Sequence, residues 1–225
     1  MKRVLRKKSV VRRLGFQSVV LLCLLSTPAL AQSFTNLNFE SANLTGYSPG
    51  SVPAADAVPG WTVYVGGTAQ TTVKYNISYG SFGIGLDILD AGSGTTIRQG
   101  SYQVFLQGGH GSSLANLGQT GTIPVSAQSL FFWAGPLTEA PSFDGHTLSL
   151  TSLGGGIYGA DISAYAGQTG ELLFKSDFVP GGGGYFLDDI QFSDQPIPEP
   201  GTLGLLLVGA ALTGARRLRR FATGL

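Results

Sequence analysis

Residues 185–192 read Tyr185-Phe186-Leu187-Asp188-Asp189-Ile190-Gln191-Phe192. Along this stretch Phe186, Asp188, Ile190 and Phe192 alternate with Leu187, Asp189 and Gln191. A period of two indicates a β-strand, because successive side chains of a strand point to opposite faces of the sheet. We therefore expect a strand over residues 185–192, with each of the two sets on its own face.

Outward from this stretch, short apolar or alternating runs recur back to residue 34, separated by Gly, Ser, Thr and Asn. They predict further strands at Phe34–Phe39, Trp61–Val65, Thr71–Tyr75, Ile84–Leu89, Tyr102–Leu106, Leu117–Ile123, Leu130–Trp133, Thr147–Leu153 and Glu171–Phe178, with Leu172 and Phe174 on one face. Many short strands at intervals of about 8–12 residues are typical of a sandwich or barrel. The Pro- and Ala-rich residues 48–60 are expected to form a surface loop, and the glycines of residues 154–159 a loop or a bulge.

Residues 32–195 are long enough to form one domain with its own core. They contain three basic and twelve acidic residues, so their net charge is 3 − 12 = −9. A surface of this charge repels phosphates, and a nucleic-acid partner is therefore disfavoured. The only cysteine, Cys23, precedes the domain, so no disulfide is expected in it.

Residues 1–31 have the three regions of a secretory signal peptide. Met1–Arg13 is basic, Val19–Leu25 is apolar, and Ala29 and Ala31 form a small-residue cleavage site. The apolar run is shorter than the roughly 20 residues that span a bilayer, which disfavours the alternative of a permanent anchor. We predict a signal helix that enters the export translocon and is cut by signal peptidase, so that Gln32 begins the mature chain.

Residues 196–225 carry a second set of export features. The motif Pro198-Glu199-Pro200 precedes the apolar run Leu203–Ala215, and the chain then carries Arg216, Arg217, Arg219 and Arg220. Arginines at the end of an apolar segment stop its transfer and stay in the cytoplasm. This order predicts a short transmembrane helix in the inner membrane, with the domain on the outer side.

Motif, apolar helix and terminal arginine cluster together resemble the PEP-CTERM sorting signal of Gram-negative bacteria. The resemblance implies that an exosortase-type enzyme processes the tail near the motif and that the membrane anchor is transient. It also implies a final location at the cell surface or in an extracellular, biofilm-type matrix. An ordinary C-terminal anchor is the alternative.

Four parts of the domain carry a further resemblance. They are Asn36–Glu40, Pro59–Trp61, Tyr102–Leu106 with Leu117–Thr120, and Asp161–Gln168 followed by Glu171–Phe174 and Phe186–Ile190. In this order they resemble a galactose-binding-like jelly roll, the sandwich of many carbohydrate-binding modules. The resemblance implies an all-β chain, with a single jelly-roll β-sandwich between the signal helix and the short transmembrane helix.

The same resemblance implies a structural calcium ion shared by the first and last strands. It gives Glu40 and Asp188 as side-chain ligands, with Asp189 as a further candidate. Calcium prefers six to eight oxygen ligands, and neighbouring carboxylates repel each other unless a cation or solvent screens them. The alternative is that these carboxylates are solvated charges.

Three functions remain open for such a domain: non-catalytic recognition of an extracellular polysaccharide, hydrolysis of a glycan, and a purely structural matrix role. We expect the first of these, without catalytic residues. A hydrolase would need paired carboxylates, either Asp87 with Asp90 or Glu139 with Asp144.

Aromatic and histidine side chains do not identify a ligand site from the sequence. Trp61 and Trp133 lie in predicted strands and are expected in the core, whereas Tyr47, Tyr79, Tyr158 and Tyr165 lie in or near loops and are better candidates for ligand contact. His110 and His146 are expected to be exposed loop residues.

Overall fold

The computed structural model describes residues 32–77, 83–109, 114–137, 139–176 and 183–198. They belong to the second of the two compact units of the chain, Ala31–Leu225. Strands make up 48% and helices 7% of the structure, and the strands form two sheets. The predicted all-β class is therefore confirmed. The predicted signal helix and transmembrane helix lie outside the described residues.

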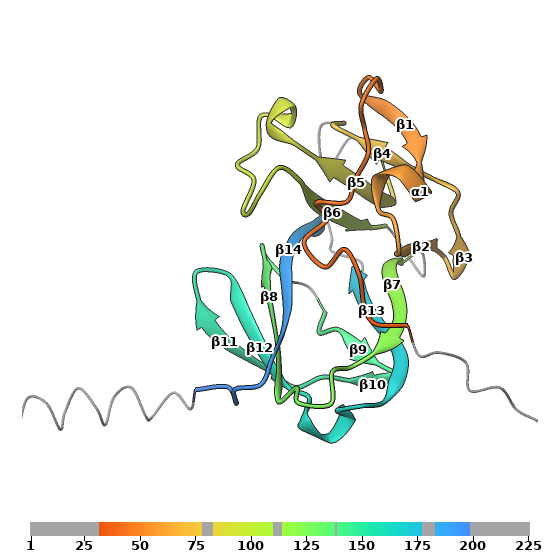
Figure 1. Cartoon of the computed structure of the whole chain (residues 1–225). Helices are drawn as coiled ribbons and strands as arrows, with labels where there is room; N and C mark the ends of the chain where they lie inside the picture. The colour runs from red at the N-terminus through yellow and green to blue at the C-terminus, as the bar shows by residue number, and fades with distance from the viewer. Residues whose placement is uncertain (1–31, 78–82, 110–113, 138, 177–182, 199–225) are drawn as a thin grey trace, which may run out of the picture. The chain divides into compact units, whose positions relative to one another are not determined.

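The larger sheet has eight strands in the order β1-β4-β5-β6-β14-β8-β12-β11 (Figure 1). Their bounds are Gly50–Pro53 for β1, Thr72–Tyr75 for β4, Gly85–Leu89 for β5, Gln103–Gly108 for β6, Gly183–Ser193 for β14, Ser129–Ala134 for β8, Ile157–Asp161 for β12 and Leu150–Gly154 for β11. Only β4 and β5 pair in parallel among these described strands. The last strand, β14, thus lies inside the sheet between β6 and β8.

The smaller sheet has six strands in the order β10-β9-β13-β7-β2-β3. Their bounds are His146–Thr147 for β10, Ser142–Phe143 for β9, Thr169–Ser176 for β13, Ala115–Thr122 for β7, Thr62–Val65 for β2 and Thr68–Ala69 for β3. Three short helices, α1 (Ala54–Ala57), η1 (Ala91–Ser93) and η2 (Ser163–Tyr165), lie in the connections. From β6 to β9 each successive strand lies in the other sheet.

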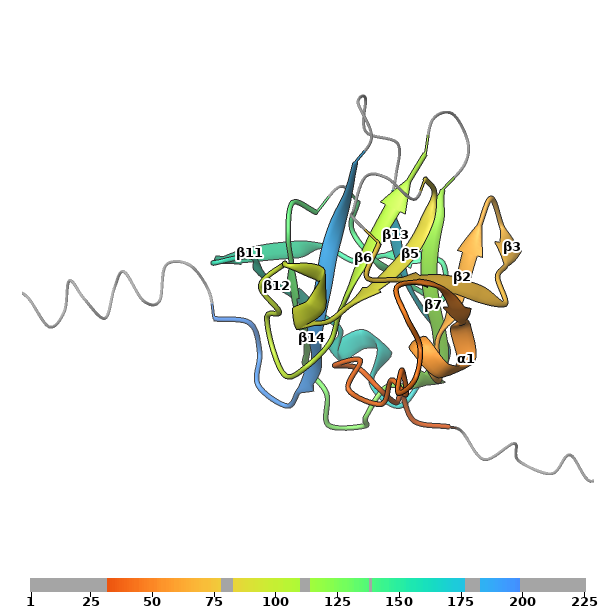
Figure 2. The same cartoon turned by 90° about the horizontal axis from the view of Figure 1, so that it is seen from above.

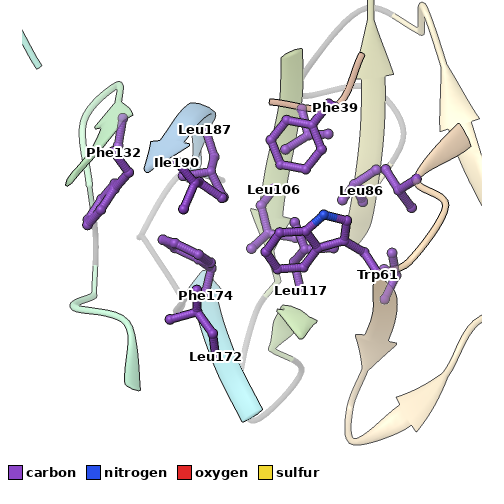
Figure 3. Packing of buried hydrophobic residues seen from close by; sticks show 14 of the residues in the cluster. Phe39, Trp61, Leu86, Leu106, Leu117, Phe132, Leu172, Phe174, Leu187 and Ile190 are labelled. Atoms are coloured by element: carbon purple, nitrogen blue, oxygen red, sulfur yellow. The ribbon is translucent and has the colours of Figure 1, made fainter. Parts of the chain in front are cut away.

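The core lies between the two sheets, and Figure 3 shows its central side chains. Phe132 of β8 meets Phe174 of β13 edge to face, with ring centres 5.2 Å apart. Leu172 and Phe174 are both fully buried, which confirms the predicted shared face. Burying an apolar side chain of this size contributes roughly 1.5–3 kcal/mol, so this cluster is the main source of stability.

A β-bulge reverses the faces of β14 at its middle. The register against β8 shifts between Asp188 and Gln191, and Asp189 has a φ of +53°. Leu187 and Ile190 therefore both face the core, while Phe186 and Asp188 lie on the opposite face. The predicted strand is confirmed, but the prediction that Phe186, Asp188 and Ile190 share one face is wrong, because an extra residue interrupts the alternation.

The predicted strand at residues 34–39 is wrong, because this segment is a turn. Asn36 and Phe39 have φ values of +50° and +60°, and the Phe39 amide donates to the Asn36 carbonyl over 3.3 Å. Asn tolerates this left-handed conformation because its side chain hydrogen-bonds nearby backbone groups, and here it accepts from the Ser41 amide. Phe39 still reaches the core, where it packs against Trp61 with ring centres 5.8 Å apart.

Two segments expected to be loops contain strands. Residues 48–60 include β1 and α1, and Pro53 is tolerated at the end of an edge strand, where no ladder amide is required. Residues 154–156 do form a turn of left-handed glycines, but β12 begins directly after it. No helix among the described residues is long and apolar enough to cross a membrane.

Candidate functional site

The connection from β5 to β6, residues 90–102, builds the candidate site. Asp90 begins it by capping η1: its Oδ1 accepts from the Gly92 amide over 2.7 Å. An Asp before a short Gly- and Ser-containing turn is a common local arrangement, because its carboxylate pairs with an amide two residues ahead. In Figure 2 this segment, coloured yellow-green, overlaps β14, to whose Asp188 its Gln99 amide donates a hydrogen bond.

Two residues at the end of β4 fix the Asp90 carboxylate. The Tyr75 hydroxyl donates to Oδ2 over 2.7 Å and the Asn76 amide to Oδ1 over 2.6 Å. Burial opposes ionisation of Asp90, but these hydrogen bonds and that from Gly92 outweigh burial and hold its pKa below the usual range. The same hydrogen bond raises the pKa of Tyr75 to about 12, so Tyr75 stays a donor.

A hollow of about 760 Å³ lies beside this carboxylate, and we call it the Asp90 hollow. Its lining includes Tyr75, Asn76, Asp90, Gly92, Ser101 and Tyr102. It therefore combines an anchored carboxylate, amide and hydroxyl groups, and two tyrosine rings. Such a mixture of apolar faces and oriented polar groups is what a small-molecule or sugar site requires.

A second hollow of about 550 Å³ lies on the other side of the segment, and we call it the Trp133 hollow. Its lining includes Ser93, Thr95, Thr96, Gln103, Trp133 and Phe186. Thr95 lines both hollows, so one short segment separates them. Among the described residues none that lines the Trp133 hollow is charged.

Trp133 lies on the outer face of the larger sheet, half-buried, and its indole Nε1 donates to the Gly155 carbonyl over 3.0 Å. The Arg98 guanidinium stands over its ring, 5.8 Å from the ring centre. The prediction that Trp133 belongs to the core is thus wrong, because in β8 it alternates with the core residues Phe132 and Ala134. Trp61 is in the core as predicted.

Backbone amides of residues 99–102 are held by two of the predicted calcium ligands. The Gln99 amide donates to Asp188 Oδ2 over 3.0 Å, and the Ser101 and Tyr102 amides donate to Glu40 Oε1 over 2.8 and 2.9 Å. This arrangement, which we call the carboxylate clamp, fixes the segment between the two hollows to the first turn and the last strand. The structure thus brings Glu40 and Asp188 to one place.

Asp188 is a fully buried carboxylate. The pKa of Asp188 is raised to about 7, mainly by burial. The hydrogen bonds from the amides of Asp189 and Gln99 oppose this shift, and the neighbouring charges of Asp189 and Glu40 add to it. Excess negative charge of this kind is the environment that a bound cation relieves. Asp189 is turned by its positive φ and accepts a hydrogen bond from the Gln191 side chain. Within the described ranges, no three His, Cys, Asp or Glu side chains are grouped to hold a metal.

The carboxylate pairs considered for hydrolysis are placed apart. Asp87 is fully buried and does not line the Asp90 hollow. Glu139 forms an ion pair of 3.3 Å with Lys175, near one end of β13, whereas Asp144 lies against Gly170, near the other end. Neither pair converges on one of the two hollows described here.

The described loop tyrosines and His146 stand outside the two hollows. Tyr47 donates to Asp56, Tyr158 stacks on core residue Phe132, and Tyr165 packs between Phe143 and His146. His146 is exposed, as predicted. Tyr79 and His110 lie outside the described residues.

A scan against protein-family models, a search among curated proteins and a search among solved structures each find no match. Function must therefore be inferred from the residues of the site. Within residues 90–102, only Asp90, as one of a hydrolase pair, and Tyr102, as the start of a strand, were singled out from the sequence. The order Asp90-Ala91-Gly92-Ser93 is a capping signal that could have marked a structured turn there.

Proposed function

We propose that the chain is an exported bacterial protein of the cell surface or extracellular matrix whose β-domain binds glycan without cleaving it. The observation that carries the binding function is the pair of aromatic- and hydroxyl-lined hollows on either side of residues 93–102. Sugar rings bind through apolar C–H faces and hydroxyl groups, and both hollows offer partners for each.

The strand order supports a jelly roll as the finer fold. Leaving out the edge strand β11, the strands from β6 to β14 fall into the sets β6-β14-β8-β12 and β7-β13-β9-β10, with the last described strand beside the first of the set. Apart from the hairpin β9–β10, successive strands of these eight lie in opposite sheets, which is the winding of two Greek keys. The larger sheet is extended at its edges by β1, β4 and β5 on one side and by β11 on the other. The smaller sheet is extended by β2 and β3.

The export route rests on the two ends of the sequence. The signal-peptide pattern of residues 1–31 predicts the translocon and signal peptidase as partners. The Pro198-Glu199-Pro200 motif, apolar run and arginines predict a transient inner-membrane anchor and an exosortase-type processing enzyme. These features favour a final location outside the inner membrane, where polysaccharide is the abundant ligand.

The properties of Asp90 favour binding over hydrolysis. Both of its oxygens already accept hydrogen bonds, and its pKa is lowered, so it suits a fixed acceptor for sugar hydroxyls rather than a general acid. Hydrolysis would also require a second carboxylate about 5–10 Å away across the same hollow.

We further propose that Glu40 and Asp188 hold a structural calcium ion beside residues 99–102. Two close carboxylates with mutual repulsion fit a hard cation, and backbone carbonyls and water would supply the remaining oxygens. Bound there, the ion would neutralise the negative charge of the carboxylate clamp and stiffen the segment that separates the two hollows.

The binding function is tested by retention on the polysaccharides that the producing cells secrete, using protein expressed from the full-length chain. Retention is expected, and Tyr102→Ala and Trp133→Ala should each weaken it about tenfold by removing a ring face. Tyr165→Ala, which removes a ring outside both hollows, is the matched control. No retention would favour a purely structural protein, and release of new reducing ends would favour a hydrolase.

A further inference from the structure

We infer that the Trp133 hollow takes an acidic sugar, with the sugar carboxylate on Arg98; this rests on the proposed glycan-binding function and names the ligand class. Arg98 is one of three basic residues in a domain of net charge −9. It stands at the Trp133 ring that lines the hollow. A guanidinium over an indole ring, at a hollow lined by Phe186 and hydroxyl groups, matches a carboxylated pyranose, which has an anionic group and an apolar ring face.

The other two basic residues are already engaged. Lys175 pairs with Glu139 over 3.3 Å, and the Lys74 ammonium donates to Ser51 Oγ over 2.8 Å. The Arg98 side chain is exposed, and within the described parts of the chain its guanidinium makes no ion pair. A planar guanidinium can therefore present two parallel donors to an incoming carboxylate.

Charge distinguishes the two hollows. The Asp90 hollow contains an ionised carboxylate that accepts from hydroxyl groups and repels acids. The Trp133 hollow is lined by hydroxyls, the Gln103 amide and aromatic rings, with no carboxylate among its described lining residues. In a strongly negative domain, this is the hollow where an anionic ligand meets least repulsion.

Asp188 does not cancel this preference. It is the residue paired with Trp133 across β14 and β8, but it is fully buried and is not part of the lining. Both of its oxygens accept hydrogen bonds, from the amides of Gln99 and Asp189.

Arg98 is held in position through its backbone. Its amide donates to Gln103 Oε1 over 3.1 Å, and the next amide, of Gln99, is part of the carboxylate clamp. The Gln103 side chain in turn donates to the Thr96 carbonyl over 3.1 Å. The cation is thus carried by an ordered segment, so less conformational freedom is lost when a carboxylate binds.

The experiment compares polygalacturonate oligosaccharides with the same material after chemical reduction of the carboxyl groups, by titration calorimetry at low salt. Protein expressed from the full-length chain is used. The acidic form should bind about tenfold more tightly than the reduced form, and added salt should narrow the difference.

Arg98→Gln should weaken binding of the acidic form about tenfold and leave the reduced form unchanged. Arg98→Lys should restore part of the loss, because the charge returns without the two parallel donors. Lys74→Gln removes the same charge from a strand residue that lines neither hollow, and it should leave binding of both the acidic and the reduced form unchanged. If the melting temperatures of these variants equal that of the natural protein, the loss of binding does not come from a loss of folded protein.

Equal binding of both forms, or an effect of Lys74→Gln as large as that of Arg98→Gln, would overturn the inference while leaving glycan binding intact. Failure of both forms to bind, together with failure to be retained on the secreted polysaccharide, would instead remove the proposed function.

Discussion

Asp87 shows how one residue can work against the stability of the domain. It is fully buried in β5, between Leu86 and Ile88 of the core, and neither carboxylate oxygen has a well-formed hydrogen bond to the part of the chain that the structure describes. Burial raises its pKa to about 7, although the nearby amides of Ile77 and Asn76 and the charge of Lys74 oppose the shift. The folded state therefore holds the proton more tightly than the unfolded chain does.

A raised folded-state pKa makes stability fall as pH rises. For Asp87 the favourable contribution is complete below its ordinary pKa of 3.8 and is lost as pH rises to about 7. Asp87→Asn should match the natural protein near pH 4 and exceed its free energy of unfolding at pH 8 by about 1–3 kcal/mol. Urea denaturation at the two pH values measures this. Asp194→Asn, an exposed carboxylate, is the control, and a variant less stable at pH 8 would contradict the account.

Position 100 requires glycine for two reasons, its backbone conformation and the close approach of a neighbouring side chain. Its φ is +65°, and an added Cβ would collide with the Glu40 carboxylate of the clamp. Gly94 has a similar φ of +76° but open space around a Cβ, so it isolates the backbone effect.

Gly94→Ala should therefore cost about 1 kcal/mol of stability, whereas Gly100→Ala should cost about 2–4 kcal/mol because the Ser101 and Tyr102 amides also lose their acceptor. Thermal denaturation of the two variants tests the difference. Equal losses would mean that Glu40 moves aside freely and that the clamp contributes little.

At the level of elements, local patterns predicted the strands and failed at their interruptions. Alternating or apolar runs correctly marked β2, β4, β5, β6, β7, β8, β13 and β14. The faces of β14 were not predictable, since nothing in Asp188-Asp189-Ile190 distinguishes a bulge from a regular strand without its partner β8. Likewise the strand character of residues 50–53 depends on pairing with β4 rather than on composition.

The candidate site was less predictable than the fold. The Asp90 and Trp133 hollows join β4, the segment 90–102, β8 and β14, which are separated by up to about a hundred residues in the sequence. Glu40 and Asp188 were paired through a family resemblance, and the structure brings them to the same segment. The sequence did not mark Arg98 as a site residue, because its proposed role depends on its position over Trp133, which only the structure shows.

The carboxylate clamp predicts how calcium acts on a whole element. A ligand that binds only the folded state stabilises it, by about 2.7 kcal/mol at a hundred times its dissociation constant. EDTA should therefore lower the melting temperature and calcium should restore it. Glu40→Gln and Asp188→Asn should abolish the response, whereas Asp161→Asn, outside the clamp, should not. An unchanged melting temperature in the natural protein would remove calcium from the proposal.

On the scale of the molecule, both ends of the domain are fastened to the sandwich. The Gln32 carbonyl accepts from the Thr122 amide over 2.8 Å, and Phe34 packs against Phe192 with ring centres 5.3 Å apart. The Gln195 carbonyl accepts from the Ser129 hydroxyl over 2.5 Å. With no cysteine after residue 23, such contacts rather than a disulfide join the two ends.

These contacts bear on where the chain is processed. Gln32 is the first residue after the predicted cleavage site, so a cut there keeps every domain contact named above. Near the other end, Ile197 lies close to Gly159 of β12, directly before the Pro198-Glu199-Pro200 motif. Cleavage upstream of Gln195 would remove backbone that the fold uses, and cleavage upstream of Ile197 would remove its side chain from Gly159, whereas cleavage at or after the motif would do neither. Mass spectrometry of the protein recovered from its natural host should therefore find an N-terminus at Gln32 and a C-terminus at or beyond Pro198.

An intact chain of 225 residues in the cytosol would contradict export, and a cut inside residues 34–195 would mean that processing breaks the domain rather than releasing it.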